Sequence, residues 1–463
     1  MQQPFYQQLE QFGDAIAVID GEQCMTYAQL AQAADRLAAN WTDAKPSRQL
    51  LALLLENTLE GLIHYLAVLR GNHAALLLDP AISDAQLKQL AELYQLDGIV
   101  GAGREQSFDY AKPASELAPD LAILLSTSGS TGIAKQVALS FTNLQANAAS
   151  ICDFLPIQAR DNTLCNLPMF YSYGLSVVNS HLLCGATLVF TPYSVMQREY
   201  WQLLESLPIH SFAGVPHSYE MLLRLGFTRK TLPELRYFTQ AGGKLDAKRV
   251  TMLAEYAEGQ GKAFYVMYGQ TEATARMAWL LPDKVKHKPD AIGTAIPGGN
   301  LTLIDDFKQP IIQPNQVGQL IYSGPNVMLG YASCRNDLSE FDPLAELETG
   351  DLAWFDDEGD FHISGRIKRM LKIHGQRIGL DASESVLAAQ ASSLACTGWD
   401  NQLLVCVTGE HALTSLAVAQ TLNIHPSTVR LLELESLPLT ANGKTDYPAL
   451  IAFAKNPSGG AND

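Results

Sequence analysis

Hydroxyl side chains and glycines gather in one stretch, residues 126–135, which reads Ser-Thr-Ser-Gly-Ser-Thr-Gly-Ile-Ala-Lys. Glycines let backbone N–H groups turn inward around phosphate oxygens, and a terminal lysine adds a positive charge. A flexible linker is the alternative, but the stretch follows an apolar run, LAILLS, typical of a buried strand. It is not a Walker A loop, because Gly-Lys-Ser/Thr is absent. We predict a phosphate-binding loop with the ligands Thr127, Ser128, Gly129, Ser130, Thr131, Gly132 and Lys135.

A second polar group, Tyr268-Gly269-Gln270-Thr271-Glu272, follows another apolar run, KAFYVM. The aromatic ring could stack on a base, and the threonine hydroxyl could meet a phosphate. The Glu272 carboxylate is a suitable ligand for Mg²⁺. Taken alone, such a pentapeptide is most often an ordinary strand end.

A third group combines Thr349-Gly350-Asp351 with Arg366. A carboxylate just after a glycine turn can bind both hydroxyls of a ribose. The guanidinium of Arg366 offers a planar pair of donors for a phosphate or a ribose. Each residue also has a simpler interpretation as part of a surface turn.

A fourth candidate is Lys444, which follows an Asn-Gly turn in the segment PLTANGK. Such a turn places the lysine at an exposed loop tip. By itself, this pattern is typical of a solvated lysine.

These groups need a scaffold, and the sequence around them predicts an α/β fold. Apolar strand-like runs alternate with helical patterns, as in LLALLL, TLEGLIHYLAVLRG and AALLLD from residue 50 onward. This rhythm predicts parallel sheets covered by helices. Strand patterns joined by turns dominate after about residue 290, and a mixed tail follows Arg366, with helices expected over 383–394 and 412–422. A tail of this length is enough for a small α+β domain.

Composition narrows the possible functions. The 463 residues include 48 Asp and Glu against 32 Lys and Arg, which gives a net charge of −16. Such a surface repels phosphate backbones and anionic lipids, so we expect no nucleic acid and no membrane as partners. The seven cysteines form no CxxC pair, and neither a signal peptide nor a transmembrane run is visible. We expect a cytoplasmic protein.

Together the four groups resemble the adenylate-forming superfamily of acyl-CoA synthetases, luciferases and peptide-synthetase adenylation domains. The resemblance extends to LPMF at 167–170, Gly242-Gly243 and GPNVMLGY at 324–331, and covers nearly the whole chain. It implies an N-terminal adenylation core over 1–366 and a mobile C-terminal lid over 367–455, with Lys368 at the hinge. Residues 456–463 are expected to form a disordered tail. We expect a compact, stand-alone acyl- or aryl-acid ligase.

The resemblance also implies a two-step reaction. A carboxylate attacks the α-phosphorus of ATP, and a phosphopantetheine thiol then takes the acyl group from the adenylate. Thr271 is expected at the α-phosphate and Glu272 at Mg²⁺, while Lys444 bridges the substrate carboxylate and the phosphate. Asp351 is expected at the ribose with Arg366 nearby. The residues expected to border the adenine are Tyr268, Gly242, Gly243 and Lys244, and Gly269 is a further expected ATP-binding residue.

The sequence departs from the family pattern at several positions. Ala134 replaces a usual proline, Gln136 replaces a usual glycine, and Tyr171 stands where many acyl- and aryl-CoA ligases carry histidine. Peptide-synthetase domains place an aspartate against the α-ammonium of their amino acid, and Gly174 occupies that position here. This favours an aryl, short acyl or fatty acid over an amino acid. The candidate acid pocket, for which ordinary core packing is the alternative, comprises Tyr171, Tyr173, Gly174, Phe212, Val215 and Ala241.

The thiol acceptor stays open between CoA and an acyl carrier protein. Either could dock at a basic strip near the predicted hinge, formed by Lys368, Arg369, Lys372 and Arg377. Two other functions remain in view. One is an amino-acid-activating enzyme that loads a carrier protein, and the other is a nucleotide-binding protein that has lost catalysis. The second is disfavoured because Glu272, Asp351 and Lys444 are all present.

Overall fold

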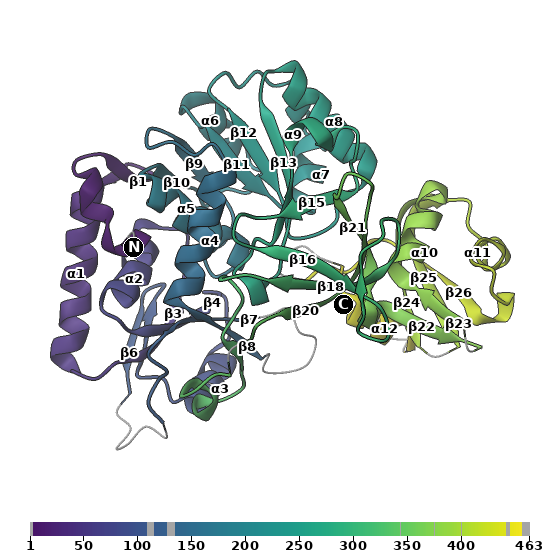
Figure 1. Ribbon diagram of the computed structural model, residues 1–463. Coiled ribbons are helices and arrows are strands. Elements are labelled where there is room, and N and C mark those ends of the chain that lie inside the picture. The colour runs from purple at the N-terminus through teal and green to yellow at the C-terminus, as the bar shows by residue number, and fades with distance from the viewer. Residues whose placement is uncertain are drawn as a thin grey trace, which may run out of the picture. The chain divides into compact units, whose positions relative to one another are not determined.

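The computed structural model describes residues 3–108, 115–126, 135–342, 344–374, 376–399, 401–440 and 445–455 (Figure 1). The chain divides into two compact units, residues 1–301 with 322–347, and residues 302–321 with 348–463. The boundary predicted at 366/367 falls within the second unit and stays a prediction. The tail predicted at 456–463 lies outside the described residues.

The first unit contains a mixed sheet whose central strands are parallel. Its strands are β1 (Ile16–Asp20), β2 (Gln23–Thr26), β9 (Asn162–Cys165), β10 (Thr187–Phe190), β11 (Ser211–Gly214), β12 (Tyr237–Gln240), β13 (Ala263–Tyr268), β14 (Ala278–Leu280) and β15 (Ala291–Ala295). Their order is β15-β14-β13-β12-β11-β9-β10-β1-β2. Pairing is parallel from β13 through β1 and antiparallel beyond them.

Helices connect the parallel strands, as the alternating pattern predicts. They are α5 (Ser172–Cys184), α6 (Arg198–Ser206), α7 (Pro216–Arg224) and α8 (Ala247–Gly259). Asp246 caps α8 by accepting a hydrogen bond from the Arg249 amide, and α7 begins with a proline, which the first turn tolerates. The α/β fold class is therefore confirmed for this unit, with antiparallel strands added at the sheet margins.

A second sheet in the same unit is built from the apolar runs near residue 50. Its strands are β3 (Leu50–Leu54), β4 (Ala74–Leu78), β5 (Gly98–Gly101), β6 (Arg104–Ser107), β7 (Leu121–Ser126), β8 (Gln136–Ser140) and β19 (Gly330–Ala332). Their order is β19-β8-β7-β4-β3-β5-β6. Every residue of β3 and β4 is buried, as expected for strands covered on both faces. The associated helices are α1 (Tyr27–Ala44), α2 (Leu59–Arg70) and α3 (Asp84–Tyr94).

Helices α4 (Phe141–Phe154) and α5 form a layer between the two sheets (Figure 1). One side of α5 faces Leu125 and Leu139 of the second sheet, and the other faces Phe212 and Tyr237 of the first. All residues from 173 to 182 are consequently buried. A helix that is buried on every side cannot show an amphipathic pattern.

His181 is completely buried in this layer as a neutral imidazole. Its Nδ1 lies 2.8 Å from the Val177 carbonyl oxygen and donates to it, so Nε2 accepts from the Tyr237 hydroxyl at 3.3 Å. Burial, opposed by the Val177 hydrogen bond and by Asp161 and aided by Arg276, lowers the pKa of His181 to about 4.

The buried imidazole predicts a pH-dependent stability. Between pH 6.5 and 4 the unfolded chain binds a proton at His181 that the folded chain does not. The free energy of unfolding should therefore fall by about 3 kcal/mol as the pH drops through this window. Urea unfolding at pH 7.5 and 4.5 should show a smaller drop for His181→Gln than for the wild type. The variant of an exposed histidine, His374→Gln, should behave as the wild type, and equal drops in all three proteins would contradict the prediction.

Five strands at the start of the second unit lie side by side in the order β17-β16-β18-β20-β21. These strands are β16 (Asn300–Ile304), β17 (Pro310–Ile311), β18 (Gly318–Ser323), β20 (Leu347–Phe355) and β21 (Phe361–Arg366). A hairpin, β22 (Met370–Ile373) with β23 (Gln376–Gly379), precedes a three-stranded sheet of β24 (Ala391–Trp399), β25 (Gln402–His411) and β26 (Val429–Leu434). The helices of this part are α10 (Leu380–Leu387), α11 (Ser415–Leu422) and α12 (Tyr447–Lys455).

The helix predicted over 383–394 is wrong in its second half. Helix α10 ends at Leu387, and Ala391–Trp399 form β24, which pairs with β25 along its length. Alanine and serine do not decide the conformation of this segment, because strand pairing outweighs a weak helix propensity. Among the residues that the structure describes, none of the helices combines the length and the apolar character needed to cross a bilayer.

Candidate active site

Four adjacent parallel strands bring most of the predicted site residues of the first unit to one sheet edge. Strands β9, β11, β12 and β13 are neighbours in this order. The loops that follow them carry Tyr171, Val215, Gly242 and Thr271, respectively. Carboxyl ends of parallel strands open toward the same edge, which is where α/β sheets commonly bind ligands.

The loop after β13 doubles back in a way that requires glycine at position 269. A Cβ on Gly269 would lie 1.6 Å from the carbonyl oxygen of Ala275. Thr274 and Ala275 have φ angles of 56° and 95°, which are strained for residues other than glycine. The predicted ligands Thr271 and Glu272 lie in the sequence between Gly269 and Ala275, whose backbones are in close contact. The doubled-back chain therefore fixes their position.

Asn326, which the sequence analysis did not select, ties this loop to the segment 324–331. Its amide group donates to the carbonyl oxygens of Ala273 at 2.7 Å and Arg276 at 3.0 Å, and its Oδ1 accepts from the Tyr322 hydroxyl at 2.8 Å. The Thr274 hydroxyl donates in return to the Asn326 carbonyl oxygen at 2.7 Å. The GPNVMLGY segment thus braces the strained loop.

Thr271 and Glu272 each meet a polar partner. Thr271 Oγ1 lies 3.3 Å from Ser172 Oγ at the start of α5. Glu272 Oε1 accepts a 2.8 Å hydrogen bond from the Tyr331 hydroxyl, and Lys135 Nζ lies 5.5 Å from the centre of the Tyr331 ring. Burial and the neighbouring Glu272 raise the pKa of Tyr331, which keeps its hydroxyl protonated as a donor. Tyr331 therefore links the predicted phosphate lysine to the predicted metal ligand.

The predicted phosphate loop connects the hairpin strands β7 and β8. Ser126 and Gln136 are cross-strand partners, and the Ser126 hydroxyl donates to Gln136 Oε1 at 2.9 Å. Gln136, which stands in place of the family's glycine, is buried and helps to close the base of the loop. The six predicted ligands from Thr127 to Gly132 lie outside the described residues.

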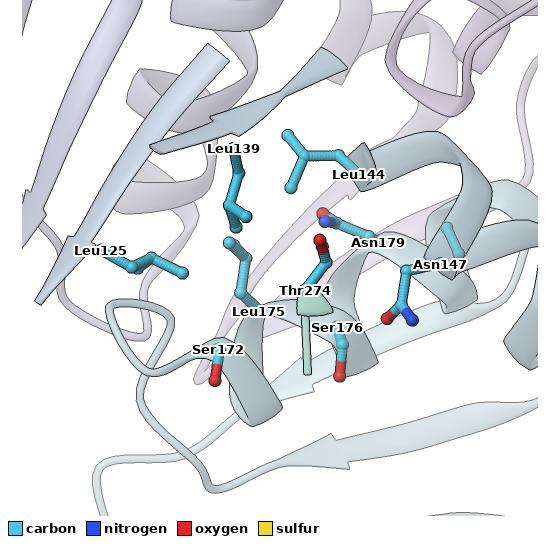
Figure 2. A pocket seen from close by; sticks show the side chains of 10 residues that line it. Leu125, Leu139, Leu144, Asn147, Ser172, Leu175, Ser176, Asn179 and Thr274 are labelled. Carbon is cyan, nitrogen blue, oxygen red and sulfur yellow. The ribbon is translucent and has the colours of Figure 1, made fainter. Parts of the chain in front are cut away.

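A cavity of about 10 Å³ lies beside this hairpin, between β7, β8, α4 and α5 (Figure 2). It has room for about one water molecule. Asn147 lines it and has no hydrogen-bond partner for its buried Oδ1, while its Nδ2 donates to the Arg276 carbonyl oxygen at 3.0 Å. The space is too small for an acid or a nucleotide. The residues that line it are Leu125, Leu139, Leu144, Asn147, Ala148, Ser172, Leu175, Ser176, Asn179 and Thr274.

The residues predicted to border the adenine follow the adjacent strands β12 and β13. Gln240 Nε2 donates to the Gly243 carbonyl oxygen at 2.8 Å, which shapes the first loop. Lys244 is exposed. Gln270 Nε2 donates to the Tyr268 hydroxyl at 3.3 Å in the second loop.

Most of the predicted acid-pocket residues form one cluster. Tyr173 and Ala241 are buried in it, and Tyr171 and Val215 pack against them. Phe212 belongs instead to the neighbouring core, where its ring stacks on Phe238 with centroids 5.7 Å apart. The structure therefore brings four of these side chains together and places the fifth beside them.

Two glycines of the pocket allow close backbone approaches. A Cβ on Gly174 would lie 2.2 Å from the Pro168 carbonyl oxygen, so this backbone excludes any side chain there. Gly242 has φ of 85°, and a Cβ on it would lie 2.5 Å from the Tyr171 hydroxyl. The Tyr171 phenol therefore packs on the loop that carries Gly242. This contact places the predicted acid pocket next to the predicted adenine site.

Arg276 is a further residue that the sequence analysis missed. It is 1% exposed, and its guanidinium lies 4.6 Å from the centre of the Tyr173 ring. Its Nη1 donates to the Met267 sulfur at 3.4 Å, and its buried Nε has no hydrogen-bond partner. Burial lowers the pKa of Arg276, against the opposing influence of nearby tyrosines. Its position four residues after Glu272 was the available indication in the sequence.

In the second unit, Asp351 and Arg366 are cross-strand partners on β20 and β21. Arg366 Nε lies 2.8 Å from Asp351 Oδ1, and the Asp351 amide donates to Thr349 Oγ1 at 3.1 Å. Asp351 is 2% exposed, whereas the Arg366 side chain is 58% exposed. The predicted ribose pair is thus brought together, with the arginine reaching solvent.

The predicted basic strip near the hinge is wrong for Arg369. Its guanidinium lies 2.5 Å from Asp381 Oδ1, 2.7 Å from Glu384 Oε1 and 3.6 Å from the centre of the Tyr447 ring. These contacts neutralise and cover the charge. Lys372 remains exposed.

The side chain of Lys368 and the whole of Lys444 lie outside what the structure describes. Leu439 and Thr445 form an antiparallel bridge, and the Asp446 amide donates to the Pro438 carbonyl oxygen at 2.8 Å. The segments before and after the lysine loop are therefore held together by these hydrogen bonds.

Comparisons with known proteins found similar sequences over most of this chain. A family model for AMP-binding enzymes matches residues 5–118 and 93–332. A probable CoA ligase from Humulus lupulus is 25% identical over 420 residues, with 81% of this chain and 79% of the relative covered. The D-alanine–D-alanyl carrier protein ligase of Lactiplantibacillus plantarum is 26% identical over 481 residues, with 92% and 93% covered.

Solved structures show the same fold. The O-succinylbenzoate coenzyme A synthetase of Bacillus subtilis, in complex with AMP, superposes with a TM-score of 0.81. The two chains are 22% identical, and the match covers 97% of this chain and 98% of the other.

Proposed function

This chain belongs to the family of AMP-binding enzymes, and from that premise we propose that it activates a carboxylic acid without an α-amino group. The acid attacks the α-phosphorus of ATP, which releases pyrophosphate and leaves an acyl-adenylate. A phosphopantetheine thiol then takes the acyl group and AMP leaves. The relatives named as a CoA ligase and as a carrier protein ligase support both CoA and an acyl carrier protein as the acceptor.

The observation that carries the acid class is the backbone at Gly174. With the Pro168 carbonyl oxygen 2.2 Å from any Cβ, no carboxylate can stand there to pair with an α-ammonium. The buried Arg276 guanidinium beside Tyr173 adds a positive charge next to the same cluster. An ammonium placed in this region would lack a counter-charge and meet a like charge, and both are costly at low dielectric.

The residue roles follow as part of the proposal. The loop from Thr127 to Lys135 holds the terminal phosphates, Thr271 contacts the α-phosphate, and Asp351 holds the ribose. Lys444 stabilises the charge that develops as the acid attacks.

Glu272 is the proposed protein ligand of Mg²⁺. Among the described residues no cluster of three or more His, Cys, Asp or Glu side chains could hold a metal ion. A single carboxylate fits an ion that is bound mainly through nucleotide phosphates, as Mg²⁺ commonly is. When bound, the ion neutralises phosphate charge, while Tyr331 orients the Glu272 carboxylate through its hydrogen bond.

ATP–pyrophosphate exchange against aryl, short-chain, fatty and amino acids tests this function. We expect exchange with one class of non-amino acid, and a loss of about 10²–10³ in Lys444→Ala, which removes a preorganised charge. The variant of a lysine on the surface, Lys88→Ala, is the control and should exchange normally. Exchange with amino acids alone would contradict the proposed substrate class, and no exchange with any acid would contradict acid activation.

A further inference from the structure

A second cavity of about 10 Å³ lies beside the candidate acid pocket, and Arg276 forms part of its wall. The cavity shares Phe212 with the predicted pocket, and the arginine covers the ring of Tyr173, another predicted pocket residue. The volume corresponds to about one water molecule. The wall consists of Leu155, Thr163, Val177, Ser180, His181, Ser211, Phe212, Ala213, Tyr237, Thr239 and Arg276.

The hydroxyl groups of this cavity are engaged with one another. Ser211 Oγ donates to Thr163 Oγ1 at 3.0 Å, and the Tyr237 hydroxyl lies 3.3 Å from His181 Nε2. Thr239 Oγ1 lies 2.8 Å from the Tyr173 hydroxyl, which also donates to the Thr239 carbonyl oxygen. Ser180 donates within its own helix at 2.8 Å. The polar wall is thus satisfied apart from its arginine.

Arg276 differs because its charge has no anionic partner among the described residues. Its Nη1 contacts a sulfur, which is a weak acceptor, and its Nε has no partner. Asp161, an acidic group that acts electrostatically on the wall residues His181 and Tyr237, is already paired with Arg236 at 2.5 Å. Buried charges in proteins are normally paired, because an unpaired charge loses its hydration without compensation. Contact with one aromatic face offsets only part of that loss.

The arginine is also held rigidly in place. Its carbonyl oxygen accepts hydrogen bonds from Asn147 and Asn326, both at 3.0 Å. It follows directly on the strained residue Ala275, in the loop that carries Thr271 and Glu272. A group bound by Arg276 would therefore be fixed relative to the residues proposed to act at the α-phosphate.

We propose that Arg276 binds a second anionic group of the substrate, so that the acid activated here is a dicarboxylic acid. This inference rests on the proposed function and names its substrate class. One carboxylate reacts with ATP, and the other pairs with the guanidinium, with one of its oxygens in the water-sized space. The planar donor fork of arginine matches a carboxylate in both charge and geometry. Arg276 is then a specificity-determining residue that takes no part in bond making.

The test compares pairs of acids that differ by one carboxylate. Butyrate with succinate, hexanoate with adipate, and benzoate with isophthalate are assayed for ATP–pyrophosphate exchange. We expect the kcat/KM of at least one dicarboxylate to exceed that of its matched monocarboxylate by about 10²-fold. The reason is that its second carboxylate pairs with a buried cation. In Arg276→Met, which keeps the length and apolar stem, that ratio should fall to about one or below, mainly through a higher KM. Arg276→Lys keeps the charge without the planar fork and should retain part of the preference.

A measurement of binding tests the same proposal if Arg276→Met is poorly active. The preferred dicarboxylate should raise the Tm of the wild type more than its matched monocarboxylate does, and this difference should vanish in the variant. Exchange with monocarboxylates at equal or higher efficiency would overturn this inference and leave acid activation standing. Equal losses for both members of a pair in Arg276→Met would assign the arginine a structural role. Absence of exchange with every acid, together with no Tm difference, would overturn both proposals.

Discussion

Gly269→Ala should lower acid-dependent pyrophosphate exchange by on the order of 10⁴ while the protein remains folded. The added Cβ would lie 1.6 Å from the Ala275 carbonyl oxygen and 2.6 Å from its carbonyl carbon. No side-chain rotation relieves a contact between two backbone segments, so the loop must open. Thr271 and Glu272 lie between the two colliding points and must move together. Loss of one preorganised group typically costs 10²–10³ in rate, and here two are displaced.

The control is Gly259→Ala at the end of α8. A Cβ on Gly259 meets no heavy atom within 4 Å, and its φ is ordinary for any residue. Exchange rates, together with far-UV circular dichroism, should show a fully active Gly259→Ala and a folded but inactive Gly269→Ala. Exchange within tenfold of the wild type in Gly269→Ala would contradict the strained loop as the element that positions Thr271 and Glu272.

The fold could be predicted from sequence where burial is uniform. Runs such as LLALLL and AALLLD became β3 and β4, which are covered on both faces, and the intervening segment became α2. The predicted helix over 383–394 failed because its residues have no strong preference of their own. Pairing with β25 decided the conformation of β24, and a partner distant in the chain is invisible to a local pattern.

The sequence could predict the residues whose side chains are proposed to contact the substrates or the metal ion. It could not predict the residues that hold those side chains in place. Glu272 and Asp351 could be selected as candidate ligands because each motif points to a ligand. Tyr331, Asn326 and Arg276 were missed, since asparagine and arginine are mostly exposed and tyrosine is intermediate, so the residue type alone indicates no role. Their roles depend on contacts across long stretches of chain, such as the 2.8 Å hydrogen bond from Tyr331 to Glu272.

Asn326→Ala should lower the free energy of unfolding by about 3–4 kcal/mol. Asn326 is 2% exposed, and its side chain accepts from the Tyr322 hydroxyl and donates to the Ala273 and Arg276 carbonyl oxygens. The Arg276 carbonyl oxygen keeps its bond from Asn147 in the variant. Two buried groups, the Tyr322 hydroxyl and the Ala273 carbonyl oxygen, lose these bonds, and each such loss costs about 1–3 kcal/mol. Urea unfolding measures the total.

Two further variants separate the bracing of the loop from general destabilisation. Tyr322→Phe removes one of the three bonds and leaves the two carbonyl oxygens held, so it should cost about 1 kcal/mol and keep exchange activity. Asn336→Ala, at an exposed position, should change stability by less than about 0.5 kcal/mol. At a temperature where all three variants are folded, Asn326→Ala alone should lose exchange activity, because only its side chain holds carbonyl oxygens on both sides of Thr274. An active and folded Asn326→Ala would mean that the strained loop keeps its conformation without this brace.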